Sequence, residues 1–319
     1  MMTSEGLRIR AAVSRADRAT LVDINNVTMP DDPTSLDELE WSDRVYPGTL
    51  RLLAEIDGHA VGAATVGRIY VYPPEFDAFW ATIVVLEPNR RRGVGTRLLD
   101  GLSDHARAAG KMSLMLATSD ARPEGGAFLT RHGFSIVDRD KIVRLDLAGV
   151  SSPAVRPPAG IALTSLAEQP DLVAGVHAVA VEAFADIPTT DEPIAAGDLA
   201  EFRARDVDRP KIPHDAFFVA VDEASGAVAG YASLILLPGS TTIAWHDMTA
   251  VARAWRGRGI AGALKRATIA WAIDHGLTTL ETGNDERNAP MRAVNARLGY
   301  RPVQDQVTMR GRIRPERAS

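Results

Sequence analysis

Two short stretches rich in arginine and glycine carry the residue types best suited to chemistry in this chain. The first, RRRGVG, runs from Arg90 to Gly95, and the second, RGRGIA, runs from Arg256 to Ala261. Glycine lets a backbone come close to a ligand, and the free N–H groups and dipole at a helix N-terminus attract anionic oxygens. Arginine adds charge-assisted hydrogen bonds to phosphate. Because an apolar segment with helical periodicity follows each stretch, we predict two phosphate-binding turns.

Neither stretch matches the two best-known phosphate-binding patterns. No Gly-Lys-Ser/Thr follows, so neither is a P-loop, and G-x-G-x-x-G is absent, so neither is a dinucleotide fingerprint. A single copy has a plain alternative interpretation, a glycine-capped loop with solvated arginines. Two copies, each after a β-rich segment and before an amphipathic helix, favour phosphate binding.

The two stretches belong to a longer internal repeat with an offset of 166 residues. The same offset aligns Arg131 with Arg297 and Phe134 with Tyr300, without a gap. Small residues and prolines separate the two copies. We therefore predict a first domain at 1–147, a linker at 148–157 and a second domain at 158–319.

Each copy reads as an α+β unit, with a mixed, mostly antiparallel sheet flanked by helices. The predicted order is a strand, helices, a hairpin, a strand, the Gly-rich turn, a long helix, a strand, a short helix and closing strands. In the second copy the strand 242–251 leads into the turn and the helix 260–274 follows it. In the first copy the corresponding strand is 79–86.

Composition excludes several function classes. The chain has 319 residues, is 45% hydrophobic, and carries a net charge of −5 with no cysteine. This balance does not favour nucleic acid or an anionic membrane as a partner, and no apolar run approaches a membrane span. Absent cysteines exclude disulfides and thiolate chemistry, and no His/Asp/Glu cluster has metal-ligand spacing, so we expect no metal. The N-terminus lacks the apolar core of a signal peptide, and we expect a cytoplasmic protein.

The turn and helix in both copies resemble motif A of the GNAT superfamily of N-acetyltransferases, which binds the coenzyme A pyrophosphate. The order of the elements also resembles that superfamily, and TGNDERNAPMRAVNARLGYRP, residues 282–302, is similar to the second half of its core. The tandem layout is similar to mycothiol synthases and related actinobacterial tandem acetyltransferases, in some of which only the C-terminal half is active. The resemblance implies two tandem GNAT-like domains, acetyl-CoA as the acyl donor and an amine as the acceptor.

The resemblance also implies which residues bind the cofactor. In the second copy they are Thr249, Ala250 and Val251 for the acyl carbonyl and pantetheine, Arg256, Gly257, Arg258, Gly259, Ile260 and Ala261 for the pyrophosphate, and Asn288 and Asn295 farther along. In the first copy they are Val85, Arg90, Arg91, Arg92, Gly93, Val94 and Gly95.

In several GNAT members a base, or a residue that holds a water, lies about nine positions before the motif arginine, which corresponds here to Asp247. Regular strand alternation would put Asp247 on one face with Trp245 and Thr249. We predict Asp247 as the base or the water-holding group; the alternative is that it only pairs with an arginine or a backbone N–H. The same count in the first copy gives Ala81, and the position of Asn288 holds Arg122, so we predict that the first copy has lost the chemistry.

Many GNAT members carry a tyrosine, which protonates the thiolate, four residues before the glycine that ends the last helix. Asn295 occupies that position here, so the proton donor stays open, because an amide hydrogen-bonds sulfur but is not an acid. Three acids of the loop 185–193, Asp186, Asp191 and Glu192, suggest a cationic acceptor, with a solvated acidic loop as the alternative. His246 is expected to be a packed strand residue.

We therefore expect an acetyl-CoA-dependent N-acetyltransferase that moves an acetyl or short acyl group to an amine of a small molecule, by direct attack in the second domain. The alternatives are a non-catalytic coenzyme A-binding sensor or scaffold, and a protein or peptide N-acetyltransferase. The acceptor, the acyl length, the oligomeric state and cofactor binding by the first domain stay open at this point.

Overall fold

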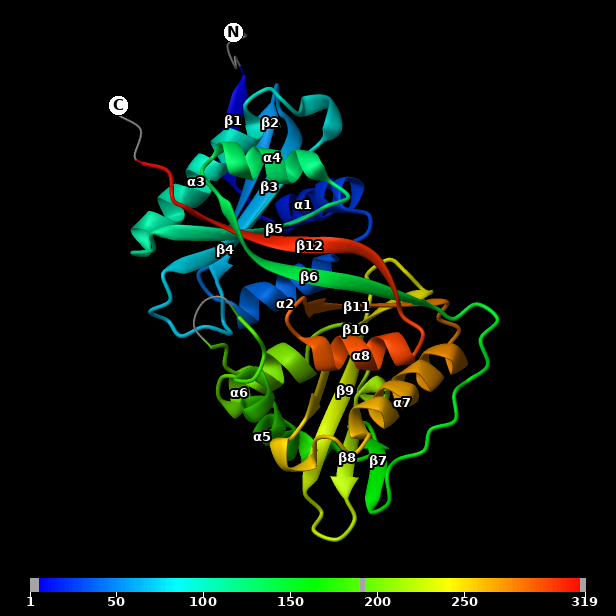
Figure 1. Ribbon diagram of the computed structural model, residues 1–319. Coiled ribbons are helices and arrows are strands. Elements are labelled where there is room, and N and C mark those ends of the chain that lie inside the picture. The colour runs from blue at the N-terminus through cyan, green and yellow to red at the C-terminus, as the bar shows by residue number, and fades with distance from the viewer. Residues whose placement is uncertain (1–5, 190–192, 316–319) are drawn as a thin grey trace. The chain divides into compact units, whose positions relative to one another are not determined.

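The computed structural model describes residues 6–189 and 193–315 of the chain. They form two compact units, each built around its own run of paired strands (Figure 1). The first unit is Met1–Val137 with Val307–Ser319, and the second is Asp138–Gln306. Two of the predicted loop acids, Asp191 and Glu192, lie outside the described residues.

The sheet of the first unit has the strand order β1-β2-β3-β4-β5-β12. Its elements are β1 (Leu7–Ala11), α1 (Arg15–Thr28), α2 (Leu36–Val45), β2 (Leu50–Ile56), β3 (His59–Arg68), β4 (Ala78–Val85), η1 (Glu87–Asn89), α3 (Val94–Ala108), β5 (Ser113–Ser119), α4 (Pro123–Arg131) and the end of β12 (Arg301–Arg312). Among β1 to β5 the ladders are antiparallel except for β4 and β5, which run parallel.

The sheet of the second unit has the order β6-β11-β10-β9-β8-β7. Its elements are β6 (Ser135–Asp146), β7 (Ile161–Ser165), η2 (Pro170–Leu172), α5 (Val173–Phe184), α6 (Leu199–Phe202), the π-helix η3 (Arg203–Val207), η4 (His214–Ala216), β8 (Phe218–Asp222), β9 (Val228–Leu236), β10 (Ile243–Val251), η5 (Arg253–Trp255), α7 (Ile260–Asp274), β11 (Thr279–Asp285) and α8 (Ala289–Arg297). The parallel ladder of this unit lies between β10 and β11.

Helices cover both faces of each sheet because alternate strand residues are apolar on both sides. In the first unit α1 and α2 pack with Leu53, Ala63 and Val84, whereas α3 packs with their neighbours on the opposite face. In the second unit α7 packs with Ala232 and Leu234 of β9, and the other face of β9 faces α5. The faces of the second sheet are called the α7 face and the α5 face below.

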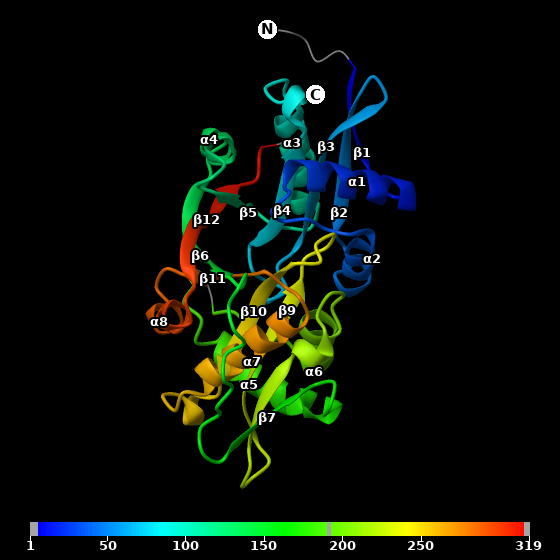
Figure 2. The same cartoon turned by 90° about the vertical axis from the view of Figure 1, so that its right-hand side faces the viewer.

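The compact units do not coincide with the two sequence copies, because the last strand of each copy lies in the sheet of the other. β6 follows the first copy but pairs antiparallel with β11 in the second unit, from Asp140↔Asp285 to Asp146↔Thr279. The end of β12 lies beside β5 in the first unit (Figure 2). There Gly311 packs on Phe134, and a Cβ on Gly311 would lie only 2.5 Å from that ring. The predicted boundary at 147 follows the sequence repeat, whereas the chain crosses between the units after Val137 and after Gln306.

No helix in the described part of the chain is long and apolar enough to cross a membrane.

Candidate active site

The two Arg/Gly-rich turns have the same backbone conformation. In each, a short 3-10 helix is followed by a left-handed residue, Arg91 at φ 63° or Gly257 at φ 75°, and then by a left-handed glycine that caps the long helix. That glycine is Gly93 at φ 83° before α3, or Gly259 at φ 87° before α7. No side chain of the described residues caps either helix, so the first N–H groups face outward, as an anion site requires. We call these turns, 90–95 and 256–261, the first and second cradle.

The first arginine of each cradle braces the turn instead of pointing freely at a ligand. Arg90 Nε donates to Val85 O at 3.1 Å, and Arg256 Nε donates to Val251 O at 2.9 Å. Arg258 lies over the Trp255 ring, with 4.7 Å from its guanidinium carbon to the ring centroid. The arginines therefore fix the geometry of the turn as well as adding positive charge around it.

Asp186 is held by two arginines at and just before the second cradle. Its carboxylate pairs with Arg253 at 2.6 Å and with Arg256 at 2.7 Å. The hydrogen bond from Arg253 is the main cause that lowers the pKa of Asp186 to about 2. These ion pairs occupy the Asp186 carboxylate and link the loop after α5 to the cradle, so the role of this acid toward a cationic acceptor stays a prediction.

The parallel strands beside the second cradle pair over only three residues. The ladder joins Ile243–Trp245 of β10 to Thr279–Glu281 of β11 and then ends. Just beyond it, Thr282 Oγ1 donates to His246 O at 2.9 Å. The strands thus separate toward the cradle, which leaves backbone groups of 249–251 unpaired on the β11 side.

A β-bulge in β10 lies at the point where the strands separate. His246 pairs with Leu234 of β9 and Thr249 pairs with Ala232, so Asp247 and Met248 together lie opposite one residue, Ser233. Since Leu234 and Ala232 share a face, His246 and Thr249 share it too. The expectation that Asp247 shares a face with Thr249 is therefore wrong: the bulge turns Asp247 to the α5 face and Thr249 to the α7 face.

Asp247 lies in a group of polar side chains of the α5 face, and this group, Asp206, Tyr231, Ser233 and Asp247, is called the carboxylate pocket below. Ser233 Oγ donates to Asp247 Oδ2 at 3.4 Å, and the N–H of Met248 also donates to the carboxylate. Removal of water by the surrounding protein raises the pKa of Asp247, and nearby Arg209 only partly opposes this effect. A carboxylate with a raised pKa is a better base than an ordinary surface aspartate.

A second carboxylate, Asp206, reaches the same pocket and was not found from the sequence. It lies on the π-helix η3, and Arg205 holds its Oδ2 with Nε at 2.9 Å and Nη2 at 2.8 Å. Desolvation is the main cause that raises the pKa of Asp206 to about 6, and the negative charge of Asp247 adds to it. No motif marks Asp206 in the sequence, because only the fold brings η3 next to β10.

Tyr231 of β9 completes the pocket. Its side chain is only 2% exposed and stacks on Phe217 with 5.5 Å between ring centroids. Its hydroxyl has no hydrogen-bond partner among residues 6–189 and 193–315. Burial, with the charges of Asp206 and Asp247, raises the pKa of Tyr231, so the hydroxyl stays protonated and is able to donate.

The α7 face behind β10 holds a buried polar cluster formed by His246, Lys265, Thr268 and Tyr300. His246 Nδ1 accepts from Tyr300 Oη at 2.9 Å, and Nε2 donates to Thr268 Oγ1 at 3.2 Å, because the Thr268 hydroxyl itself donates to Lys265 O. Burial lowers the pKa of His246 well below its ordinary value. His246 is fully buried, so it is packed, as expected, and holds β10 at the bulge.

The two asparagines predicted to bind the cofactor already make internal hydrogen bonds. Asn288 Oδ1 caps α8 by accepting from the N–H of Met291 at 3.3 Å. Asn295 is 2% exposed, and its Nδ2 donates to Asn284 Oδ1 at 2.6 Å. Asn295 Oδ1 has no partner within the described chain. One N–H of the Asn295 amide is thus engaged, and its oxygen is an acceptor without a partner in the described chain.

The first unit lacks the bulge. Across the described ladder from Gly62↔Val85 to Arg68↔Phe79, β3 and β4 pair without a register shift. Ala81 consequently points into the core on the α3 side. Thr65 of β3 stands at the position of Ser233, counted from the ladder ends Gly62 and Gly230.

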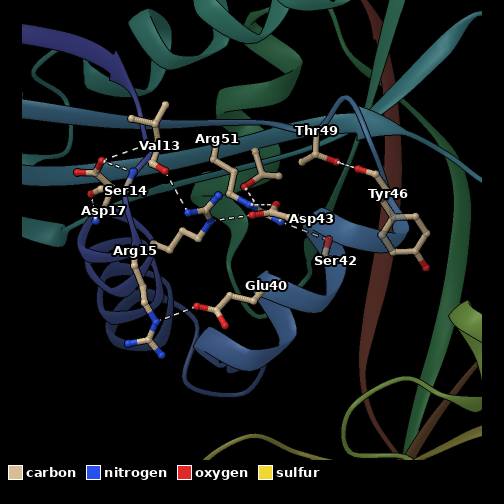
Figure 3. A network of polar contacts seen from close by, with 12 residues as sticks. Val13, Ser14, Arg15, Asp17, Glu40, Ser42, Asp43, Tyr46, Thr49 and Arg51 are labelled. Atoms are coloured by element: carbon tan, nitrogen blue, oxygen red, sulfur yellow. Dashed lines mark hydrogen bonds and ion pairs between the residues drawn. The ribbon is translucent and has the colours of Figure 1, made fainter.

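In the first unit an arginine, Arg51, lies in a network of polar contacts (Figure 3) and reaches Thr65, the residue at the position of Ser233. Arg51, only 8% exposed, donates to Thr65 Oγ1 at 3.3 Å and pairs with Asp43 at 3.0 Å, and Asp43 also pairs with Arg18 at 2.7 Å. A cavity of about 350 Å³ lies beside this network. Farther along, Arg122, at the position of Asn288, pairs with Asp31 at 2.8 Å.

No group of three or more His, Asp or Glu residues within 6–189 and 193–315 is arranged to hold a metal ion.

Comparisons with known proteins agree with this geometry. The Acetyltransferase (GNAT) family matches residues 19–134 and 181–300. The mycothiol acetyltransferase of Thermobifida fusca (strain YX) is 29% identical over 264 residues, which is 77% of this chain and 78% of that protein. A tandem GNAT protein from the clavulanic acid biosynthesis pathway has a similar fold, with a TM-score of 0.77, 23% identity, and coverage of 98% of this chain and 100% of that chain. A GCN5-related N-acetyltransferase from Sphaerobacter thermophilus is similar with a TM-score of 0.72, 19% identity, and coverage of 98% and 97%.

The chain belongs to the acetyltransferase (GNAT) family, with two tandem domains of the GNAT fold. It is an acetyl-CoA-dependent N-acyltransferase of the α+β class. Both family matches end at the aromatic residue after the last helix, Phe134 or Tyr300, before the exchanged strands complete the sheets.

Proposed function

We propose that the second unit transfers an acetyl group from acetyl-CoA to an amine of a small molecule, and that Asp247 takes the proton of the ammonium group, directly or through a water. The amine nitrogen then attacks the thioester carbonyl carbon, a C–N bond forms, and the C–S bond breaks to release coenzyme A. Asn295 offers no acid, so a water supplies the proton to the thiolate. A thiol with an ordinary pKa near 8.5 is a tolerable leaving group without a dedicated acid.

One observation carries this proposal: both units have a cradle and a parallel ladder of three residues, but within the described residues only the second unit adds a bulge that presents a carboxylate. The backbone groups of 249–251, left unpaired on the β11 side where the strands separate, suit an N–H group that polarises the thioester carbonyl. In the first unit the ladder is regular, and Arg51 would repel an ammonium ion.

The test measures acetyl-CoA binding by calorimetry, and coenzyme A release with a thiol reagent on a panel of primary amines. Gly259→Glu puts a negative charge at the second cradle, where nothing lies within 4 Å of the added Cβ. Gly259→Ala carries the same left-handed strain without the charge, and Gly93→Glu and Gly93→Ala are the matched pair in the first cradle.

We expect Gly259→Glu to raise the Kd for acetyl-CoA at least tenfold over Gly259→Ala and to abolish turnover, whereas Gly93→Glu leaves turnover intact. Asp247→Asn should lower kcat by about 10²-fold or more with the Kd for acetyl-CoA unchanged. Turnover lost only in Gly93→Glu would move the active site to the first unit. An inactive wild type that binds acetyl-CoA would favour a coenzyme A sensor.

A further inference from the structure

The pocket around Asp247 contains more negative charge and more unsatisfied polar groups than a single base needs. Two carboxylates, Asp206 and Asp247, are close enough that each influences the pKa of its neighbours. The buried Tyr231 hydroxyl has no partner in the described chain. An unsatisfied buried polar atom is costly for the fold, and a polar ligand atom next to the Tyr231 hydroxyl would remove that cost.

Asp206 is held in place from the protein side. Arg205 is 7% exposed, and its position is fixed by Ala196 O at 3.1 Å, by Glu201 at 3.5 Å and by the Phe184 ring. Both Arg205 contacts to Asp206 use Oδ2, and Oδ1 accepts no hydrogen bond from the residues that the structure describes. The side chain of Asp206 is 26% exposed, so this free oxygen is accessible to a ligand.

The π-helix η3 explains why Asp206 has this orientation. The α-helix that begins at Leu199 stops at Phe202, and the chain continues as one wide turn, Arg203–Val207. π-turns of this kind are rare and occur frequently at functional sites. The wide turn brings the neighbouring residues Arg205 and Asp206 to the same pocket, where Arg205 is the positioning group and Asp206 the ligand group.

We infer that Asp206 is a second acceptor-binding residue, and that Asp206, Asp247 and Tyr231 Oη together hold the amino end of the substrate. The inference rests on the proposed function and deepens it. Asp206 Oδ1 accepts from the ammonium group and binds it, Asp247 at the bulge takes its proton, and Tyr231 donates to a polar acceptor atom next to the amine. The site therefore selects a cationic primary amine that carries a hydrogen-bond acceptor beside it, such as an amino alcohol or amino sugar.

Among residues 6–189 and 193–315, the charged and titratable groups that face Asp206 are Arg205 and Glu201 on its own segment, Arg209 after it, and Asp247 and Tyr231 on the sheet. The two arginines do not cancel three carboxylates. The pocket thus favours a cation over a neutral ligand, and binding of the amine should strengthen as the pH rises through the range in which the carboxylates ionise.

The test compares Asp206→Asn with Asp208→Asn in the coenzyme A release assay, with glucosamine, ethanolamine and putrescine as probes. Asp208 is two residues on, its side chain is 44% exposed, and it lies 3.0 Å from Arg203 and 3.8 Å from His214, so it is the matched control. We expect Asp206→Asn to raise KM for the best amine at least tenfold, with KM for acetyl-CoA within twofold of wild type. Asp208→Asn should change neither, and Asp206→Glu should recover part of the loss.

Tyr231→Phe keeps the test decisive if Asp206→Asn does not fold. It keeps the ring stacked on Phe217 and removes a hydroxyl that has no partner in the described chain, so the fold should not be weakened. We expect a three- to tenfold rise in KM for glucosamine or ethanolamine and no rise for putrescine, which has no polar atom beside its amine.

An active wild type whose KM for the amine is unchanged in Asp206→Asn and in Tyr231→Phe overturns this inference and leaves the proposed function standing. A wild type that binds acetyl-CoA but acetylates none of the probes overturns both. If Asp206→Asn raises KM for acetyl-CoA and KM for the amine by the same factor, Asp206 supports the structure of the unit, and its role as a ligand group is overturned.

Discussion

Replacement of Lys265 by methionine is expected to stabilise the second unit. Lys265 lies in the middle of α7, is 1% exposed, and has its Nζ 5.2 Å from the centroid of the Tyr300 ring. It makes no salt bridge with an acid among the described residues. The matched residue of the first unit is Leu99, fully buried in α3, so this helix position packs well with an apolar side chain.

The size of the effect follows from the cost of burying the charge. Burial lowers the pKa of Lys265 from 10.5 to about 7. At about 1.4 kcal/mol per pKa unit, the folded state disfavours the charged form by about 5 kcal/mol. The lost contact with the Tyr300 ring offsets about 1 kcal/mol of this. With imperfect packing of the new side chain, Lys265→Met should gain about 2–4 kcal/mol at pH 7.

The pH dependence of the free energy of unfolding tests the sign of this predicted effect a second time. The folded-state pKa is lower than the unfolded one, so the unfolded chain binds more protons between about pH 7 and 10.5, and wild-type stability should rise with pH across that window. Below pH 7 the full penalty is present. Lys265→Met removes this contribution, so the stability difference between variant and wild type should shrink as the pH rises.

Urea unfolding of wild type and Lys265→Met at pH 7 and pH 9.5 measures both effects. The neighbouring Arg266, which is half-buried and bonded to Gly262 O, provides the control variant Arg266→Met. The reasoning is refuted if Lys265→Met is less stable than wild type at pH 7, or if its stability difference from wild type does not change between the two pH values.

Three further outcomes are expected. Asp186→Asn removes the carboxylate that pairs with Arg253 and Arg256, so the Kd for acetyl-CoA should fall two- to fivefold in calorimetry. At 0.5 M salt the fall in Kd should be smaller, because ions screen the freed positive charge. Thr282→Val deletes the hydrogen bond to His246 O and should cost about 1–2 kcal/mol in urea unfolding, with a lower kcat because the bulge is less well held. Gly311→Ala drives a methyl into Phe134 and should destabilise the first unit by about 1–3 kcal/mol in the same assay; an unchanged midpoint would contradict the contact.

Local sequence patterns predicted much of the fold. The helix predicted at 260–274 is α7, Ile260–Asp274, because a glycine precedes an unbroken apolar pattern there. The two cradles and the tandem layout followed from the repeat. Tyr300 and Phe134 are both buried, at 2% and 3% exposed, in the matched places that the repeat predicted.

The strand exchange could not be predicted from the same patterns. β6 and β12 are the last strands of the two copies, and either has the alternation to complete either sheet. Which sheet each one joins depends on contacts far away in the chain, such as Gly311 against Phe134. A boundary drawn from the repeat therefore places β6 with the first copy, whereas its ladder lies in the second unit.

The candidate site divides in a similar way. The sequence and the family resemblance were enough to select Asp247, nine positions before Arg256. The face of the sheet to which Asp247 points could not be predicted, because regular strand alternation gives the wrong face. One extra residue in a strand reverses the faces beyond it, and a bulge leaves no clear mark in residue types. The acids of the loop after α5 had suggested an acceptor site, yet Asp186 pairs with arginines that lie 67 and more residues later in the chain.

The sequence by itself determined what is local: the glycines that adopt left-handed conformations, the helix starts behind them, the repeat, and hence the family. The tertiary structure decided everything that depends on distant partners: the exchanged strands, the bulge opposite Ser233, the pairing of Asp186, and the meeting of Asp206 with Asp247 and Tyr231. The physical reason is that turn and helix conformations are set by neighbours within a few residues, whereas ladder register, desolvation and ion pairing are set by whichever segments the folded chain brings together.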